Sequence, residues 1–450
     1  VITGLLLTVI LWYGSPRYEE TDLIVEDPFF FEEPRDGIYA IFPARIVLPL
    51  SGEEYLLCRR GTDKYGELWE LILSCLQENY FTEEKNGFLP EHPLAIIYFD
   101  PPFPWEVIAN AAEQADISVE RMQFFINDND GEMFLLLQGA HEDGTHEELV
   151  LKTAEDHFLP EIQNLIAAMI DEDNPRYHLL TDALFADGDQ SVPGEVRIEG
   201  DIYLPAEDYL LQAHLTLVRE QIRTDEMLKA VFVNEKLARK IEEADGTLIF
   251  TDGEKGLRIS DYVEYTAPRL EKGMAAYSYA RAIQKANEYL CYYGGWPKDL
   301  YLVHMLAGNN SRATPQQGET SYYVGWSFYA DGLPIMGSPG RTEIRFNDQG
   351  LYYYKRSLYR PSDFSTKKVT AAAATEAVAK AFEYYYVEET DVSTPVKLRD
   401  IYPAYKAADA LDGNEVRAYP VWVVRINDAT VYLDLADLTL SGRSEHDEYF

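Results

Sequence analysis

The chain has 450 residues, and its 77 acidic residues against 39 Lys and Arg leave a formal net charge of −38. Such a surface repels phosphate backbones, which excludes a nucleic-acid partner. A hydrophobic content of 46% and an aromatic content of 13% exclude disorder over most of the length. The cysteines are too few and too scattered for a disulfide framework or a Cys-x-x-Cys motif: Cys58, Cys75 and Cys291.

An uncharged apolar segment opens the chain, from Val1 to Tyr13, and a Gly-Ser-Pro sequence ends it. A membrane-spanning helix needs about 20 apolar residues, so this segment is too short to cross a bilayer. The chain begins with Val and carries no basic residue before the segment, and we therefore expect residues 1–14 to be a truncated transmembrane helix. The alternatives are a buried core helix and the remainder of a signal peptide.

Small residues on this segment indicate how it would pack in a membrane. Gly4 and Thr8 lie four residues apart, and a helix places residues at this spacing on one face. Small residues on one face let transmembrane helices approach closely. The residues expected at such a partner contact are Gly4, Leu5, Leu7, Thr8, Leu11 and Trp12.

Residues 15–170 are expected to form an N-terminal α+β domain. The sequence from Ile41 to Leu57 predicts two strands around a Ser-Gly turn, and a helix follows from about Tyr65. The apolar residues of this helix recur at helical spacing, which predicts one buried face: Leu68, Leu71, Ile72, Cys75 and Leu76. Three later strands are separated by Asp-Gly turns and predict an antiparallel meander: 121–126, 132–138 and 147–152.

An acidic segment that ends in proline, Asp171 to Pro175, interrupts this pattern and marks the expected end of the first domain. A middle α+β domain is expected over residues 171–315, and a C-terminal α+β domain over residues 316–450. We place their boundary in the polar stretch from Asn309 to Ser321, because the strand near Trp326 fits either unit.

The second half of the chain repeats itself at an offset of 96 residues, the distance from Phe250 to Phe346. Four further identical pairs share this offset: Asp252 with Asp348, Ala275 with Ala371, Tyr289 with Tyr385, and Trp326 with Trp422. Each copy has the pattern of a hairpin, a helix, a strand and a second hairpin. The repeat predicts duplication of one α+β unit in which antiparallel strands cover a helix.

Residues that carry chemistry form no recognisable motif in the sequence. His141 and His146 are five residues apart around an Asp-Gly turn, whereas a zinc-binding helix needs two histidines four apart. The segment from Asn127 to Glu132 is similar to a calcium loop, but its alignment places Ile126 and Leu137 at ligand positions. No nucleophile elbow or phosphate-binding loop is present. We therefore expect no catalytic residue, no metal and no cofactor.

Seven segments combine into a longer pattern: LLLTVILW (5–12), IFPARIVLPLSGEEYLL (41–57), YGELWELI (65–72), FVNEKLARKIEEADGTLIFTDGEKGLRI (232–259), NEYLCYYGGWPKDLYL (287–302), GWSFYADGLPIM (325–336) and VWVVRINDATVYLDL (421–435). Each segment alone is weakly specific. Together, and in this order over nearly the whole chain, they resemble the YycH family, whose members regulate the cell-wall sensor histidine kinase WalK/YycG of low-GC Gram-positive bacteria.

The resemblance implies one N-terminal membrane helix and an extracytoplasmic region of three α+β domains of mainly antiparallel sheets. The last two domains would resemble each other and the companion regulator YycI. The implied function is regulation of a WalK/YycG-like sensor histidine kinase by protein–protein contact, with a YycI-like protein as a second partner at the cell membrane. Such a regulator shifts the kinase between states only by binding one state more tightly than the other. The resemblance assigns no catalytic residue.

Two alternatives stay open at this point. The first is a secreted hydrolase that uses a carboxylate pair, which a buried pocket holding two acids would favour. The second is a soluble extracellular module that binds wall polymer or inhibits a protease. An exposed edge strand or an aromatic groove would favour that module.

Overall fold

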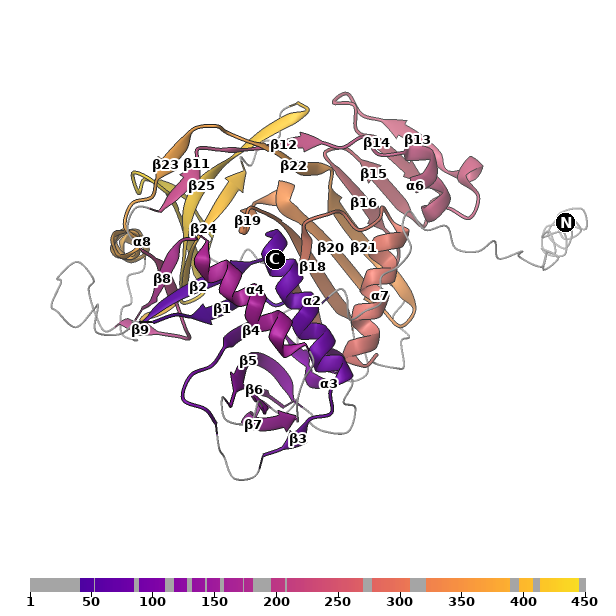
Figure 1. The fold of residues 1–450 in the computed structure, drawn as a ribbon. Helices are drawn as coiled ribbons and strands as arrows, with labels where there is room; N and C mark the ends of the chain where they lie inside the picture. The colour runs from indigo at the N-terminus through magenta and orange to yellow at the C-terminus, as the bar shows by residue number, and fades with distance from the viewer. Residues whose placement is uncertain are drawn as a thin grey trace, which may run out of the picture.

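The fold, taken from a computed structural model, is α+β, with two large sheets and helices packed on them (Figure 1). The predicted class of mainly antiparallel sheets with packed helices is confirmed. The structure describes these residues: 41–51, 53–84, 89–109, 117–127, 132–141, 144–153, 158–172, 174–180, 196–206, 209–269, 277–307, 321–388, 396–407 and 413–444. Residues 1–14, the expected membrane-helix stub, lie outside these ranges. Within the ranges, no helix combines the length and the apolar character that a bilayer span requires.

The first sheet has nine strands in the order β10-β8-β2-β1-β4-β5-β6-β7-β3, and all of its pairings are antiparallel. Its strands are β1 (Arg45–Pro49), β2 (Glu54–Arg59), β3 (Thr82–Glu83), β4 (Ala95–Pro104), β5 (Ser118–Ile126), β6 (Met133–Ala140), β7 (His146–Thr153), β8 (Arg176–Leu179) and β10 (Tyr203–Pro205). The predicted hairpin is β1 and β2, and the predicted meander is β5, β6 and β7. Both are confirmed.

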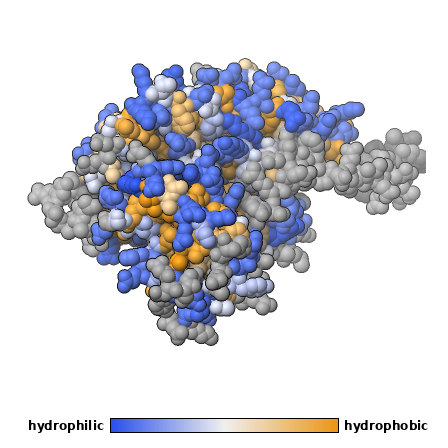
Figure 2. Space-filling model, viewed as in Figure 1, coloured by the Kyte–Doolittle hydropathy of each residue, from blue (hydrophilic) through white to orange (hydrophobic). Residues whose placement is uncertain are grey.

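Three helices pack on this sheet: α2 (Asp63–Glu78), α3 (Trp105–Ile108) and α4 (Leu159–Asp171). Helix α2 begins two residues before the predicted start and buries the predicted face, of which only Leu71 is partly exposed. Each fully buried Leu or Ile of this face stabilises the fold by about 1.5–3 kcal/mol. Helices α2 and α4 contact each other, and Figure 2 shows apolar side chains gathered on the surface over them.

Strands β8 and β10 belong to the first sheet, although both follow residue 171. Strand β8 pairs with β2, and β10 pairs with β8. The strand order therefore continues past the acidic break at Asp171 to Pro175. The division of the chain at residues 170 and 315 stays a prediction.

The second large sheet joins sixteen strands, and its longest path runs β13-β14-β15-β16-β21-β20-β18-β19-β24-β25-β12-β22. Four strands branch from this path or extend it: β9 pairs with β24, β17 with β18, β26 with β25, and β27 with β26. Two pairings are parallel, β19 with β24 and β9 with β24, and the remaining ones are antiparallel. A short separate sheet pairs β11 (Leu210–Gln212) with β23 (Lys368–Thr370).

The strands of the second sheet are β9 (Val196–Ile198), β12 (Leu215–Arg219), β13 (Arg239–Glu242), β14 (Leu248–Thr251), β15 (Gly256–Ile259), β16 (Tyr262–Thr266), β17 (Leu300–Ala307), β18 (Tyr322–Ala330), β19 (Leu333–Met336), β20 (Arg341–Asn347), β21 (Gly350–Ser357), β22 (Tyr359–Phe364), β24 (Val396–Ala407), β25 (Glu415–Ile426), β26 (Ala429–Asp434) and β27 (Leu440–Ser444). Helices α6 (Thr224–Val231), α7 (Tyr279–Tyr292) and α8 (Ala374–Glu388) accompany it, with short 3₁₀ turns η2 (Glu235–Leu237) and η3 (Ser338–Gly340).

The element order agrees with the predicted duplication. In one copy β14, β15, β16, α7, β17, β18 and β19 follow one another. In the other β20, β21, β22, α8, β24, β25 and β26 occupy positions about 96 residues later, with the short β23 before α8. The turns after the two tryptophan-bearing strands also correspond, because Asp331 and Asn427 both have positive φ, of 49° and 51°. Short hairpin turns favour such residues, since Asn and Asp tolerate the left-handed conformation.

The two large sheets are held against each other by hydrogen bonds between distant segments. The Tyr279 hydroxyl donates to the Pro102 carbonyl at 3.0 Å, and the Gly61 amide donates to the Tyr301 hydroxyl at 3.0 Å. A single hydrophobic core cluster draws residues from both sheets. A cavity of about 600 Å³, called the larger cavity below, lies between the two sheets.

Candidate functional site

The residues predicted to contact a membrane partner lie outside the described part of the chain. They are Gly4, Leu5, Leu7, Thr8, Leu11 and Trp12. Their role therefore stays a prediction. The other motif that the sequence raised, around His141 and His146, lies at a hairpin between β6 and β7, where His141 Nε2 lies 2.5 Å from a Glu147 oxygen. Over the described ranges, no group of three or more potential metal ligands comes together.

An exposed edge is formed by residues 233–241, which contain η2 and the start of β13. Val233, Leu237 and Ile241 are 90%, 73% and 40% exposed. Among the described strands β13 pairs with β14 alone, so it forms one edge of the second sheet, at the upper right of Figure 1. Exposed apolar side chains on a sheet edge are a surface suited to binding another protein.

The charge of the 233–241 edge differs from that of the whole chain. Its exposed basic residues are Lys236, Arg239 and Lys240, and its one acidic residue is Glu235. Within residues 233–241 basic side chains outnumber acidic ones, and Lys240 pairs with the exposed Glu242, the last residue of β13, at 3.4 Å. Electrostatic complementarity favours a partner surface that is acidic around an apolar centre.

A larger cavity of about 600 Å³ lies between the two sheets, with walls from β1, β2 and β4 on one side and β24 and the β18–β19 turn on the other. Its charged lining residues balance in sign: Arg45, Arg59, Arg60, Arg121 and Arg399 against Asp100, Glu120, Glu199, Asp201 and Asp400. Several of these charged side chains form ion pairs with each other, as Arg121 does with Asp201 and Arg399 with Glu199.

The first network of the larger cavity centres on Asp201. Its Oδ2 accepts a hydrogen bond from the Tyr98 hydroxyl at 2.6 Å and lies 3.0 Å from Arg121 Nη1. The Tyr98 and Tyr203 hydroxyls are 2.9 Å apart, and the Arg45 guanidinium stacks over the Tyr98 ring at 4.6 Å. Burial raises the pKa values of Tyr98 and Tyr203, so both phenols stay protonated donors.

The second network centres on Arg60, whose side chain is buried. Its Nε donates to the Pro43 carbonyl at 2.8 Å, and its Nη2 donates to the carbonyls of Phe42 at 2.8 Å and Asp100 at 3.2 Å. The guanidinium also lies 5.7 Å from the centre of the Tyr329 ring. Arg60 therefore joins β2, the segment before β1, β4 and β18, and its contacts serve the fold.

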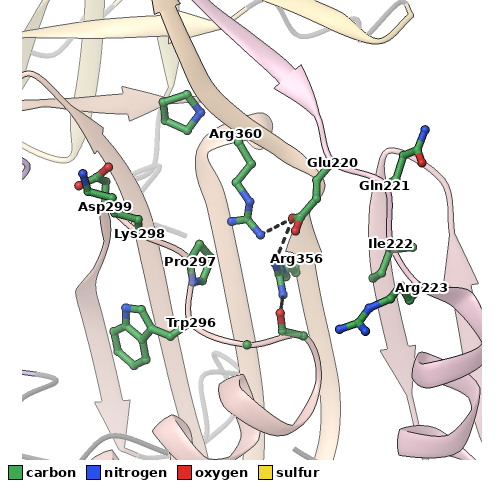
Figure 3. Close-up of a pocket in the computed structure, with 13 residues that line it drawn as sticks. Glu220, Gln221, Ile222, Arg223, Trp296, Pro297, Lys298, Asp299, Arg356 and Arg360 are labelled. Carbon is green, nitrogen blue, oxygen red and sulfur yellow. Dashed lines mark hydrogen bonds and ion pairs between the residues drawn. The ribbon is translucent and has the colours of Figure 1, made fainter. Parts of the chain in front are cut away.

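A smaller cavity of about 430 Å³ lies where four segments of the second half meet (Figure 3). The segments are the link from β12 to α6, the turn from α7 to β17, the end of β21 and the start of β22. Its charged lining is cationic, with four basic side chains against two acidic ones: Arg223, Lys298, Arg356 and Arg360 against Glu220 and Asp299. Apolar lining comes from Ile222, Trp296, Pro297 and Pro361.

Glu220 connects the two arginines at the centre of the smaller cavity. Arg356 Nη2 lies 3.1 Å from Glu220 Oε2, and Arg360 Nη2 contacts the same oxygen. Figure 3 shows both guanidinium groups directed at this carboxylate. Arg356 also donates through Nη1 to the carbonyl of Gly294, where any Cβ would collide with that nitrogen. Glycine at position 294, with φ of 144°, is therefore required to admit the arginine.

The sequence did not predict either cavity. The turn from α7 to β17 is the Gly-Gly-Trp-Pro-Lys-Asp portion of a segment that carried the family resemblance, but its role as a cavity wall depends on distant partners. Arg356 meets Gly294 across 62 residues and Glu220 across 136 residues. The adjacent glycines were the one local indication of an unusual backbone at this point.

Similarity to known proteins identifies the family of this chain. The model of the YycH protein C-terminal domain matches residues 199–438, which is more than half of the chain. The chain belongs to the YycH family. The matched residues include the 233–241 edge and the whole lining of the smaller cavity. The family has a regulatory role in the WalK/YycG two-component system, and the predicted family membership is confirmed.

A solved structure gives the same fold. The crystal structure of YycH from Bacillus subtilis superposes with a TM-score of 0.60 at 14% identity, covering 89% of this chain and 98% of that chain. An uncharacterized protein from Eubacterium rectale matches at 12% identity, covering 60% of this chain and 93% of that chain. Its TM-score of 0.38 is too low to support an argument about the fold. No curated protein matches the chain.

Proposed function

We propose that this chain is a membrane-anchored, extracytoplasmic regulator that modulates a WalK/YycG-like sensor histidine kinase by direct contact, together with a YycI-like companion. The observation that carries the proposal is the YycH-family match over residues 199–438, because that family supports a regulatory role in this system. The likeness of the fold to Bacillus subtilis YycH over 89% of the chain agrees with it.

The 233–241 edge supplies the contact surface for the kinase in this proposal. Its apolar side chains are exposed, its strand has an open edge, and three of its exposed side chains are basic. A strand of the extracytoplasmic part of the kinase would add to β13 and bury Val233 and Leu237. Contact of this kind changes kinase activity if the edge binds one signalling state more tightly than the other.

Membrane fractionation of the complete chain, with and without residues 1–13, tests the anchor. We expect the complete chain in the membrane fraction and the shortened chain in the soluble fraction, with co-purification of the kinase weakened by the deletion. If both forms are soluble and bind the kinase equally, the prediction of a membrane anchor is wrong. Contact between the folded region and the kinase is tested separately by substitutions in the 233–241 edge.

A double substitution, Val233→Glu with Leu237→Glu, tests the contact surface. We expect at least a tenfold weaker affinity for the kinase, since two charged groups enter an apolar contact. Leu440→Glu is the matched control, because Leu440 is also exposed but lies on β27. If the double variant and Leu440→Glu bind the kinase equally well, the 233–241 edge is not the contact surface. No change in kinase autophosphorylation on adding the unaltered chain contradicts regulation itself.

A further inference from the structure

The smaller cavity has a charge of opposite sign to the chain that contains it. The four basic side chains of its lining outnumber the two acidic ones, and one of the four, Arg223, pairs with Glu226 outside the lining at 2.7 Å. The chain as a whole carries −38. A concave surface with an excess of arginine is typical of a site for an anionic group, because guanidinium N–H groups match carboxylate and phosphate oxygens.

Glu220 leaves the two arginines incompletely paired. Both guanidinium groups contact the same oxygen, Oε2, while Arg356 Nε and Arg360 Nη1 are buried without a hydrogen-bond partner. The Arg356 side chain is only 4% exposed, so bulk solvent has little access to it. A buried donor without a partner destabilises the protein, and a better-placed acceptor would relieve this cost.

Glu220 is the most exposed of the three charged side chains in this cluster. Glu220 is 41% exposed and lies on the link between β12 and α6, so its side chain can turn outward to solvent. Arg360 remains held after such a movement, because its guanidinium lies 5.2 Å from the centre of the Phe328 ring. Arg356 remains held by the Gly294 carbonyl. The two cations would then face the cavity with two open donor edges.

We propose that the smaller cavity binds a small organic acid, whose carboxylate bridges Arg356 and Arg360 in place of Glu220. The apolar body of the acid would lie against Ile222, Trp296 and Pro297, which line the same space. The volume of about 430 Å³ is in the range of small-molecule sites. The presence of Glu220 between the arginines demonstrates that a carboxylate fits there.

The charge of the chain favours a small ligand over an acidic macromolecule. A protein or polymer with many negative charges would be repelled by the chain, whose net charge is −38. A single carboxylate experiences less of this repulsion, because salt screens charges beyond about 8 Å at physiological ionic strength. This inference goes beyond the proposed kinase contact and uses a different site.

Titration calorimetry of the full chain with benzoate tests the inference, since benzoate combines one carboxylate with an apolar ring. Glu220→Gln removes the competing charge, and we expect it to bind benzoate at least tenfold more tightly than the unaltered chain. Glu199→Gln is the matched control. Glu199 is similarly exposed and contacts two cations, Lys397 and Arg399, but it lines the larger cavity. We expect no change in benzoate affinity for this control.

Three further measurements complete the test, with folding of each variant checked by circular dichroism. Arg360→Gln should weaken benzoate binding at least tenfold, and benzamide, the neutral counterpart, should not bind. Inorganic phosphate should bind more weakly than benzoate. The inference is overturned if benzoate binds no variant, if Glu220→Gln and Glu199→Gln behave alike, or if phosphate binds better. Kinase affinity, measured in parallel, should not change with Glu220→Gln.

Discussion

The two cavities contain the same kinds of side chain but differ in how their charges are arranged. In the larger cavity five arginines face five acids, and the buried Arg60 donates to three backbone carbonyls. In the smaller cavity four cations face two acids, and one half-exposed carboxylate serves two arginines. Both cavities have charged side chains in their lining and lie between elements that are distant in the sequence.

The difference separates two uses of arginine. In the larger cavity arginines and acids are equal in number, and although Arg45 Nε and Arg121 Nε are buried without a hydrogen-bond partner, each guanidinium contacts carbonyls, carboxylates or aromatic rings. Removal of such an arginine should mainly destabilise the fold, because several acceptors lose their donor. Where cations exceed anions, part of the hydrogen-bonding capacity is left for an external group. The larger cavity is therefore interpreted as a structural junction, and the smaller cavity as a site of recognition.

The largest effect is expected from Arg60→Met in the larger cavity. Three carbonyls lose a buried donor, and at about 1–2 kcal/mol each the free energy of unfolding should fall by roughly 3–6 kcal/mol. Urea unfolding followed by circular dichroism measures this loss. Arg399→Met, at the partly exposed rim of the same cavity, is the control and should cost less than about 1 kcal/mol. If both substitutions lower the free energy of unfolding equally, the buried Arg60 is no more important for stability than the partly exposed Arg399.

The next effect concerns Cys58 on β2, between two residues that line the larger cavity. Burial raises the pKa of its thiol from 9.0 to about 12. The native thiol therefore stays protonated below pH 12, while the unfolded thiol ionises near pH 9. The stability from this group is fully present below pH 9 and is lost as pH rises from 9 to 12. At pH 9 its alkylation should be about 500-fold slower than in the unfolded chain, because the thiolate is the nucleophile. Mass spectrometry of the labelled Cys58 peptide measures the two rates, and similar rates would mean that the wall of the junction opens readily.

The smallest effect compares two glycines, one at each cavity. Gly294→Ala should lower the free energy of unfolding by about 3 kcal/mol, since its positive φ is unfavourable for alanine and the new Cβ meets the Arg356 guanidinium. Gly332→Ala, with φ of 78° and its nearest neighbour at 3.2 Å, should cost about 1 kcal/mol. Only the first should also weaken benzoate binding. A larger loss of stability in Gly332→Ala than in Gly294→Ala would contradict the close packing of Arg356 against Gly294.

Local patterns in the sequence were sufficient for several elements. The spacing of Leu68, Ile72 and Leu76 predicted the buried face of α2, because a helix repeats every 3.6 residues whatever packs on it. The duplication was equally visible, since the same order of hairpin, helix and strand requires the same residue pattern twice. The pairing of β8 and β10 with the first sheet was not visible, because these short strands lack a pattern that names their partner.

The amino-acid sequence was enough to establish the α+β class, the repeat of 96 residues, the YycH resemblance and the absence of a familiar catalytic motif, since each of these depends on residues close together in the chain. Only the tertiary structure brought Glu220, Gly294 and Arg356 to one place, across separations of up to 136 residues. The physical reason is that charge balance in a cavity depends on which strands become neighbours. Strand pairing is determined by the packing of the whole molecule rather than by any one segment.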